Sequence, residues 1–298
     1  MINSNQRFPV IEEGMKRFTC CLLILAGLIF FSFLSGCRSE SVQNITEETE
    51  TASSAQLKKD IEDLTRAIEQ NPDDATAHYS RGSAYLKMGK LIDAISDYSK
   101  ALDLDPNFTD VYINRGNAYK DIQRYDRAVL DYTTAAQLDP ENDSAYLYMG
   151  DLYLEARLFD EAIKAYTKAI EINPDQIYAF SNRGLAYKSL QEFDKAISDY
   201  TKSLELDPTV VVNYNNRGNA YFMAGKLEEA ISDFTKALEL DPSFALAYSG
   251  RGFAYEQLGK LKEALADFKD FLEYAPDSYS VYIIQTEAKI RELEQKLR

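Results

Sequence analysis

Apolar residues recur along this chain at helical spacing, and the whole pattern repeats every 34 residues. The clearest marker of the period is a glycine that is followed three residues later by a tyrosine. A fixed period of this length is typical of arrays in which each repeat is one supersecondary unit. The marker glycines are Gly82, Gly116, Gly150, Gly184, Gly218 and Gly252.

Each repeat predicts two helices, A and B, that cross at close range. Position 8 of the repeat is always glycine and position 20 is always alanine, so the two backbones can approach each other there. Aromatic side chains at positions 4, 11 and 24 fill the space beside the crossing. A proline at position 32 ends helix B, because proline lacks the donor that a helical ladder needs. Repeats 1 to 6 are 75–108, 109–142, 143–176, 177–210, 211–244 and 245–278.

One more helix is predicted at each end of the array. Residues 56–72 place Leu57, Ile61 and Leu64 on one helical face, which predicts helix B of an N-terminal half-repeat. Residues 279–298 have no proline and no second helix, so they predict a helix that caps the last repeat.

The residues at positions 8, 11, 20 and 32 resemble the tetratricopeptide repeat. The resemblance covers about three quarters of the chain, within a predicted domain of 56–298, and implies an all-α fold, a right-handed superhelical solenoid of stacked antiparallel helix pairs. It also implies that helix A of each repeat lines a concave groove in which a ligand lies. Stacking is required because one repeat cannot bury both of its faces alone.

A targeting segment is predicted ahead of the array. Lys16 and Arg17 precede an apolar run, and the run ends in Leu34-Ser35-Gly36-Cys37, which resembles a bacterial lipobox. The resemblance implies that 1–36 is removed as a signal peptide and that Cys37 is lipidated, with an uncleaved anchor helix as the alternative. We predict that the true start is Met15, so that 1–14 lies upstream of it.

The residues after the signal predict a polar tether and an exported location. Residues 37–55 have no aromatic side chain and are predicted to link the lipid anchor to the array. Arg38 follows the cysteine where related lipoproteins retained in the inner membrane carry Asp. We therefore expect a protein held by its lipid in a bacterial membrane. In a cell with two membranes this is the outer one, with the protein facing the periplasm.

Composition and motifs argue against an enzyme. A formal net charge of −15 disfavours nucleic acid as a partner, since phosphate binding needs clustered Lys and Arg. His78 is the single histidine, and we interpret it as a core or cap-facing ring rather than a metal ligand. The sequence predicts no metal, no cofactor and no catalytic residue.

Positions 7 and 23 predict an ion pair between helices A and B of the same repeat. They are Arg and Asp in five repeats, and both are replaced together in repeat 3, by Met149 and Ala165. Coincidence is the alternative. We expect Arg217 and Asp233 to be one such pair.

Candidate ligand contacts follow from the helix A positions that the family uses. Asparagine amides offer a donor and an acceptor to an extended peptide backbone, although they also serve simply to keep a groove polar. Lys and Arg are absent from positions 2, 5 and 6, which argues against a chaperone-type carboxylate clamp. The candidates are Asn114, Asn117, Lys120, Tyr148, Tyr178, Asn182, Lys188, Asn216 and Asn219.

We therefore predict a non-enzymatic scaffold that binds a protein or an extended peptide and is held at a membrane by lipid. The alternative is a structural factor that self-associates into a homo-oligomer through its convex face or its terminal helix.

Overall fold

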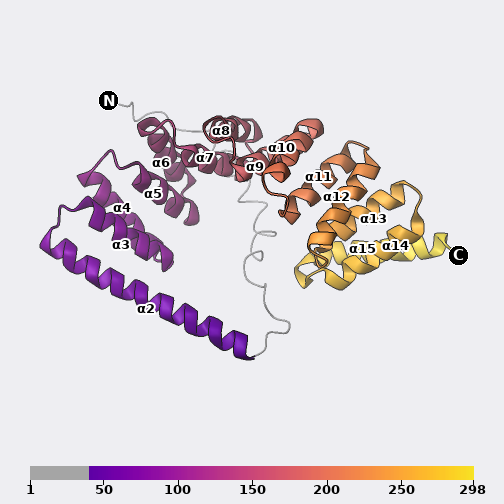
Figure 1. The fold of residues 1–298 in the computed structure, drawn as a ribbon, viewed down its shortest axis with the longest axis horizontal. Helices are drawn as coiled ribbons and strands as arrows, with labels where there is room; N and C mark the ends of the chain where they lie inside the picture. Colours follow the sequence, from indigo (N-terminus) through magenta and orange to yellow (C-terminus); the bar gives the residue numbers. More distant parts are fainter. Residues whose placement is uncertain (1–39) are drawn as a thin grey trace. The chain divides into compact units, whose positions relative to one another are not determined.

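The computed structural model describes residues 40–298, with side chains from residue 54 onward. Every element in this range is helical, which confirms the predicted all-α fold. The chain divides into two compact units, one that ends at Leu158 and one from Phe159 to Arg298 (Figure 1). Within each unit, consecutive helices pack against one another as a solenoid of helix pairs.

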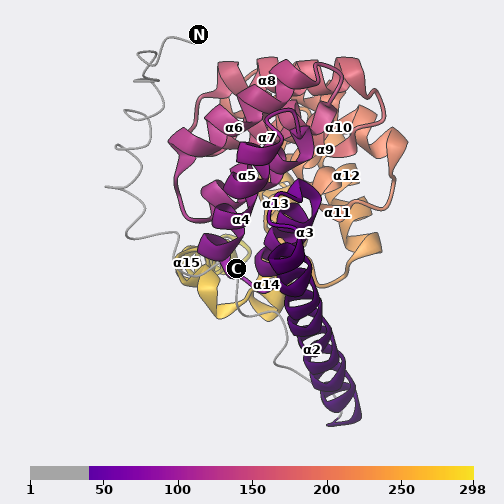
Figure 2. The ribbon, with the colours of Figure 1, turned by 90° about the vertical axis from the view of Figure 1, so that its left-hand side faces the viewer.

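The first unit holds the half-repeat, repeats 1 and 2, and helix A of repeat 3. Figure 2 shows α2 running well past the end of α3. The helices are α2 (Glu40–Gln70), α3 (Ala75–Lys87), α4 (Leu91–Leu104), α5 (Thr109–Asp121), α6 (Tyr125–Leu138) and α7 (Asp143–Glu155).

The second unit holds helix B of repeat 3, repeats 4 to 6 and the capping helix. The helices are α8 (Phe159–Ile172), α9 (Ile177–Ser189), α10 (Phe193–Leu206), α11 (Val211–Met223), α12 (Leu227–Leu240), α13 (Ala245–Gln257), α14 (Leu261–Tyr274), the short 3-10 helix η1 (Asp277–Tyr279) and α15 (Ser280–Lys296). In the repeats of both units, odd-numbered helices are A helices and even-numbered ones are B helices.

Helix α2 begins earlier than the sequence analysis predicts. The predicted boundary lies at residue 56, but the helix starts at Glu40 and so includes most of the predicted tether. The physical reason is that no glycine or proline interrupts 38–70, and Glu, Gln and Ala favour helix. The predicted signal peptide and Cys37 lie outside the described residues. None of the described helices is long and apolar enough to cross a membrane.

The glycine at position 8 makes room for the aromatic ring at position 24 of the same repeat. A Cβ on Gly116 would lie 2.6 Å from the Tyr132 ring, and one on Gly184 would lie 3.1 Å from the Tyr200 ring. The position 24 rings are fully buried in all six repeats, which confirms the predicted close crossing. They are Tyr98, Tyr132, Tyr166, Tyr200, Phe234 and Phe268.

The capping helix covers repeat 6 with one face only. Ile290 and Leu293 of α15 are buried in a cluster with Ala264 and Phe268 of α14. The helix lies within the predicted range 279–298.

Candidate functional site

Each repeat except the third has a bidentate Arg–Asp ion pair between its helices A and B, here called the brace, as predicted. The guanidinium Nε and Nη2 both donate to the carboxylate, at 2.7 to 2.9 Å, from helix A to helix B. The Nη1 atom donates to a Ser or Thr hydroxyl on the preceding helix B at 3.0 to 3.1 Å. The pairs are Arg81–Asp97, Arg115–Asp131, Arg183–Asp199, Arg217–Asp233 and Arg251–Asp267.

These arginines serve the repeat itself and are not available to a ligand. The Arg217 guanidinium lies 5.7 Å from the Tyr214 ring centre and 6.0 Å from that of Tyr221, which are positions 4 and 11. Burial raises the pKa of the Asp131 carboxyl, and the hydrogen bonds from Arg115 oppose that shift. The carboxylates are nearly buried, so the geometry is that of a packed, charge-assisted bond.

His78 takes part in the same brace in repeat 1. The ring is 6% exposed, with Nδ1 3.4 Å from Asp97 Oδ1 and Nε2 3.2 Å from the Pro72 carbonyl oxygen. It therefore packs in the core, as the sequence analysis interprets it.

The remaining exposed side of the A helices, here called the A-helix face, consists of positions 2, 6, 9, 12 and 13. In the first unit its asparagines are partly used. Asn114 Nδ2 donates to the Tyr79 hydroxyl at 2.9 Å, and Asn117 Oδ1 accepts from the Tyr132 hydroxyl at 2.7 Å. Tyr148 stacks on Tyr132, with ring centres 5.7 Å apart. These side chains, predicted to be free for a ligand, therefore also hold the repeats together.

In the second unit the candidates Tyr178 and Asn216 are less constrained by neighbouring groups. Tyr178 is 71% exposed. Asn182 and Asn216 are half-buried, and no hydrogen bond within the second unit is found for the Asn216 side chain. Asn219 Nδ2 donates to the Asn215 backbone carbonyl at 2.9 Å, which leaves its Oδ1 free within this unit.

The two candidate lysines at position 12 are Lys120 in repeat 2 and Lys188 in repeat 4. Both are half-buried, and neither makes an ion pair with any described residue. Burial lowers the pKa of the Lys188 ammonium. An unpaired, partly desolvated cation on an exposed face is a group that a ligand can satisfy.

Two features of the face were not predicted. Apart from Tyr178, which is one of the predicted ligand contacts, large apolar side chains are exposed on it in the second unit, and polar groups on it interact with the tyrosines beneath. The Tyr98 hydroxyl donates to Ser83 Oγ at 3.2 Å, and Tyr132 pairs with Asn117, so position 24 reaches position 9 of its own repeat. The exposed apolar residues are Tyr178, Val212, Met223, Leu246 and Phe253.

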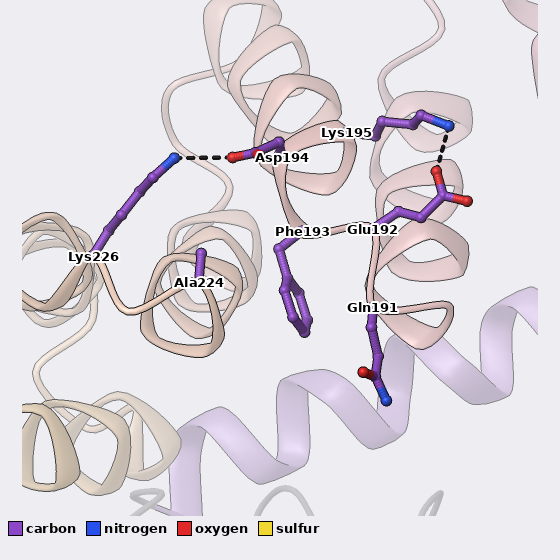
Figure 3. Close-up of a pocket in the computed structure, with 7 residues that line it drawn as sticks. All are labelled: Gln191, Glu192, Phe193, Asp194, Lys195, Ala224 and Lys226. Carbon is purple, nitrogen blue, oxygen red and sulfur yellow. Dashed lines mark hydrogen bonds and ion pairs between the residues drawn. The ribbon is translucent and has the colours of Figure 1, made fainter.

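A hollow of about 470 Å³ lies at the turns between helices in repeats 4 and 5 (Figure 3). Its charged side chains satisfy one another: Lys226 Nζ lies 2.9 Å from Asp194 Oδ1, and Lys195 pairs with Glu192. The Lys226–Asp194 pair joins repeats 4 and 5. Because its charged side chains are already paired, the hollow offers a ligand little to bind.

Family models described as TPR repeat or tetratricopeptide repeat match most of the chain. Together they span 56–108 and 113–278. One model matches 56–89 and 218–259, and a second matches 75–108 and 177–210. Three further models match 113–177, 199–232 and 245–278. No curated protein sequence matches the chain.

Solved structures of repeat proteins resemble the chain in fold. YrrB, described as a TPR protein with an unusual peptide-binding site, is 26% identical with a TM-score of 0.54, over 62% of this chain and 95% of YrrB. MamA is 31% identical with a TM-score of 0.53, over 57% of this chain and 93% of MamA. A tetratricopeptide repeat protein from Parabacteroides merdae is 22% identical with a TM-score of 0.56. The match covers 86% of this chain and 98% of that protein, and it supports the fold alone. The chain belongs to the tetratricopeptide repeat family.

Proposed function

We propose that this protein is a non-enzymatic adaptor that holds an extended segment of a partner protein on its A-helix face. The observation that carries the proposal is the exposure of Tyr178, Val212 and Leu246 at position 2 of α9, α11 and α13. Exposed apolar and aromatic side chains with amides between them are typical of protein-binding surfaces. The likeness to YrrB, a peptide-binding protein of the same family, agrees with this proposal.

Site-specific photo-crosslinking in cells tests the proposal. A benzophenone amino acid at Tyr178 is expected to form adducts with a partner protein, which mass spectrometry then identifies. The control is the same amino acid at Ser198, an exposed site on helix B of the same repeat. Adducts of equal yield at both sites would place the partner elsewhere and overturn the proposal.

We also propose that the protein is exported and held by lipid at Cys37 in a bacterial membrane, the outer one in a cell that has two. The order of basic start, apolar run and Leu-Ser-Gly-Cys supports this. The variant Cys37→Ala is expected to leave the membrane fraction. Continued tight attachment of that variant would support the uncleaved anchor helix instead.

Self-association is a second candidate function, favoured by the outer face of α15. Val281, Tyr282 and Ile284 are 62%, 59% and 65% exposed, and such clustered apolar side chains often mark an interface. Light scattering of the full chain is expected to show a concentration-dependent oligomer that Ile284→Lys disrupts. A monomer at all concentrations would end this candidate and leave the adaptor proposal standing.

A further inference from the structure

His78 is the only histidine of the chain, and its ring lies where α2, α3 and α4 meet in the first unit (Figure 1). The ring belongs to α3. Its Nε2 atom is 3.2 Å from the carbonyl oxygen of Pro72, in the turn that follows α2. Its Nδ1 atom is 3.4 Å from Asp97 Oδ1 on α4. The ring is 6% exposed, so water has little access to replace either oxygen.

Both partners of the ring are hydrogen-bond acceptors, because neither a carbonyl nor a carboxylate has a proton to donate. A neutral imidazole has one N–H group and one lone pair. In either tautomer, the ring of His78 would bond to one oxygen and turn its lone pair toward the other. The imidazolium has two N–H groups and can donate to both oxygens. The contacts of His78 therefore fit the protonated ring better than the neutral one.

Tyrosine at the same position of other repeats makes the bond to the proline but has no second donor. The Tyr112 hydroxyl donates to the Pro106 carbonyl at 3.3 Å, and the Tyr248 hydroxyl donates to the Pro242 carbonyl at 3.2 Å. His78 makes this link with the side chain whose charge ordinarily changes between about pH 5 and 8. Repeat 1 thus has a titratable group where these repeats have a constant donor.

Two charged side chains lie closest to the ring and act in opposite directions. The Asp97 carboxylate, 8% exposed, favours the imidazolium. Arg81 on α3 donates to the same carboxylate through Nε and Nη2, both at 2.8 Å, and its positive charge opposes a second proton on the ring. The gain from protonation therefore comes mainly from the added hydrogen bond, which replaces a contact between a lone pair and an acceptor.

The other charged groups of the neighbouring elements have their own partners or face solvent. Asp74 accepts from the Ala77 N–H at the start of α3. Arg66 and Glu69 on α2, Asp73 in the turn and Lys100 on α4 are exposed. On α5, Arg115 is bonded to Asp131.

We propose that His78 is a pH-dependent latch that holds α2 on repeat 1. Among the described residues, α2 is the first helix, and none of its described side chains is fully buried. Its other polar link to α3 is the Thr65 hydroxyl, which accepts from Arg81 Nη1 at 3.1 Å. The docked state makes one more hydrogen bond with the protonated ring, so a fall in pH favours docking. Loss of the proton breaks one bond and lets α2 open more easily.

NMR of the full-length protein tests the charge of the ring. Labelling with 15N-histidine gives one imidazole, since the chain has a single histidine and the purification tag is chosen without one. The 15N shifts of the ring nitrogens distinguish the imidazolium from the two neutral tautomers. We expect a cationic ring at about pH 5.5 and a neutral ring at about pH 8.5. A ring with the same charge at both pH values overturns the latch.

Hydrogen exchange of residues 57–70 tests the docking of α2. Exchange is corrected for its intrinsic dependence on pH and is compared with that of α13, which contains no histidine. Relative to α13, we expect opening of α2 to be about threefold or more rarer at the lower pH, as for the gain of one hydrogen bond. A ratio that does not change with pH contradicts the proposal.

Two variants without a titrating ring separate His78 from the carboxylates around it. His78→Tyr restores the residue of repeats 2, 3, 5 and 6, and it keeps a donor for the Pro72 carbonyl. His78→Phe copies Phe180 of repeat 4 and has no donor. Both should fold, and in both the exchange ratio of α2 to α13 should no longer depend on pH. A pH dependence that persists in both variants would assign the effect to other groups and overturn the latch.

Discussion

The arginine at position 7 connects three helices of the array through a single side chain. Arg217 bonds to Asp233 on its own helix B, to Thr201 on the preceding helix B, and lies near two tyrosine rings. The carboxylate is 8% exposed, so it depends on the arginine for most of its solvation. Removing either partner leaves a nearly buried charge without compensation.

We therefore expect strong coupling between Arg217 and Asp233. Arg217→Met or Asp233→Ala alone should lower the free energy of unfolding by about 3 kcal/mol. The double variant, which copies Met149 and Ala165 of repeat 3, should lose about 1–3 kcal/mol less than the sum. Urea unfolding of all four proteins measures this, and additive losses would contradict a direct pair.

The turn between helices A and B offers a second prediction at the scale of one residue. Gly225 has φ +76°, and Gln191 occupies the same position with φ +62°. The left-handed region is strained for residues with a Cβ. A Cβ at Gly225 would meet nothing within 4 Å, so a substitution there tests the backbone alone.

Gly225→Gln is accordingly expected to lower the free energy of unfolding by about 1 kcal/mol, because it adds a Cβ at positive φ. The matched variant Gln191→Gly should be neutral or slightly stabilising, since relief of strain is offset by the greater freedom of glycine when unfolded. Thermal unfolding of the two variants checks the signs. Destabilisation by Gln191→Gly greater than that by Gly225→Gln would rule out strain as the cause.

The brace could be predicted from the sequence, but the state of the candidate ligand contacts could not. The joint loss of Arg and Asp in repeat 3 can be read directly from the aligned repeats of the sequence. The hydrogen bond from Tyr132 to Asn117 depends on how far a buried ring reaches across to another helix, and spacing alone does not give that distance. The same reach explains why the Tyr200 hydroxyl is unpaired. Leu185 stands at position 9 of that repeat, where repeat 2 has Asn117, and its side chain cannot accept a hydrogen bond.

At the scale of elements, the contact of α11 with α9 and α10 is polar where the equivalent contacts are apolar. Asn213 Nδ2 donates to Ser181 Oγ at 2.8 Å and to Ser203 Oγ at 2.7 Å, and Asn213 and Ser203 are almost fully buried. Between repeats 1 and 2 the same positions hold Ala101 and Val111, which pack in one apolar cluster. Buried hydrogen bonds of this kind favour one register between elements over others.

Replacing both buried partners should cost less than replacing one. Asn213→Ala removes two hydrogen bonds and leaves a cavity, so it is expected to lower the free energy of unfolding by about 1–3 kcal/mol. Asn213→Val with Ser203→Ala copies the repeat 1–2 contact and should stay within about 1 kcal/mol of the wild type. Chemical denaturation measures both, and a double variant that is less stable than Asn213→Ala would show that the polar contact is required.

The elements themselves were predictable wherever the period holds, because the glycine, alanine and proline of each repeat mark a crossing and an end. The prediction was less accurate for α2, which begins at Glu40 rather than near residue 56. A polar stretch without glycine or proline is compatible with a tether or with an extended helix. Its hydrophobic pattern is too weak to distinguish the two.

At the scale of the whole molecule, stability in a repeat array is a sum over repeats and the contacts between neighbours. The Arg–Asp brace contributes in five repeats, and repeat 3 carries Met149 and Ala165 in its place. In α7, the Met149 sulfur accepts only a long contact from the Thr133 hydroxyl, at 3.8 Å, where an arginine would donate. Local opening should therefore be easiest in repeat 3.

Hydrogen exchange read by mass spectrometry is expected to show faster exchange in α7 and α8 than in α5, α6, α11 and α12, because opening there breaks no Arg–Asp brace. The double variant Arg217→Met with Asp233→Ala gives repeat 5 the residues of repeat 3, and it should raise exchange in α11 and α12 toward the level of α7 and α8. Exchange in α5 and α6 should not change, since each repeat contacts only its neighbours. Equal protection of all six repeats in the wild type would mean that apolar stacking, and not the brace, sets how stability is distributed along the array.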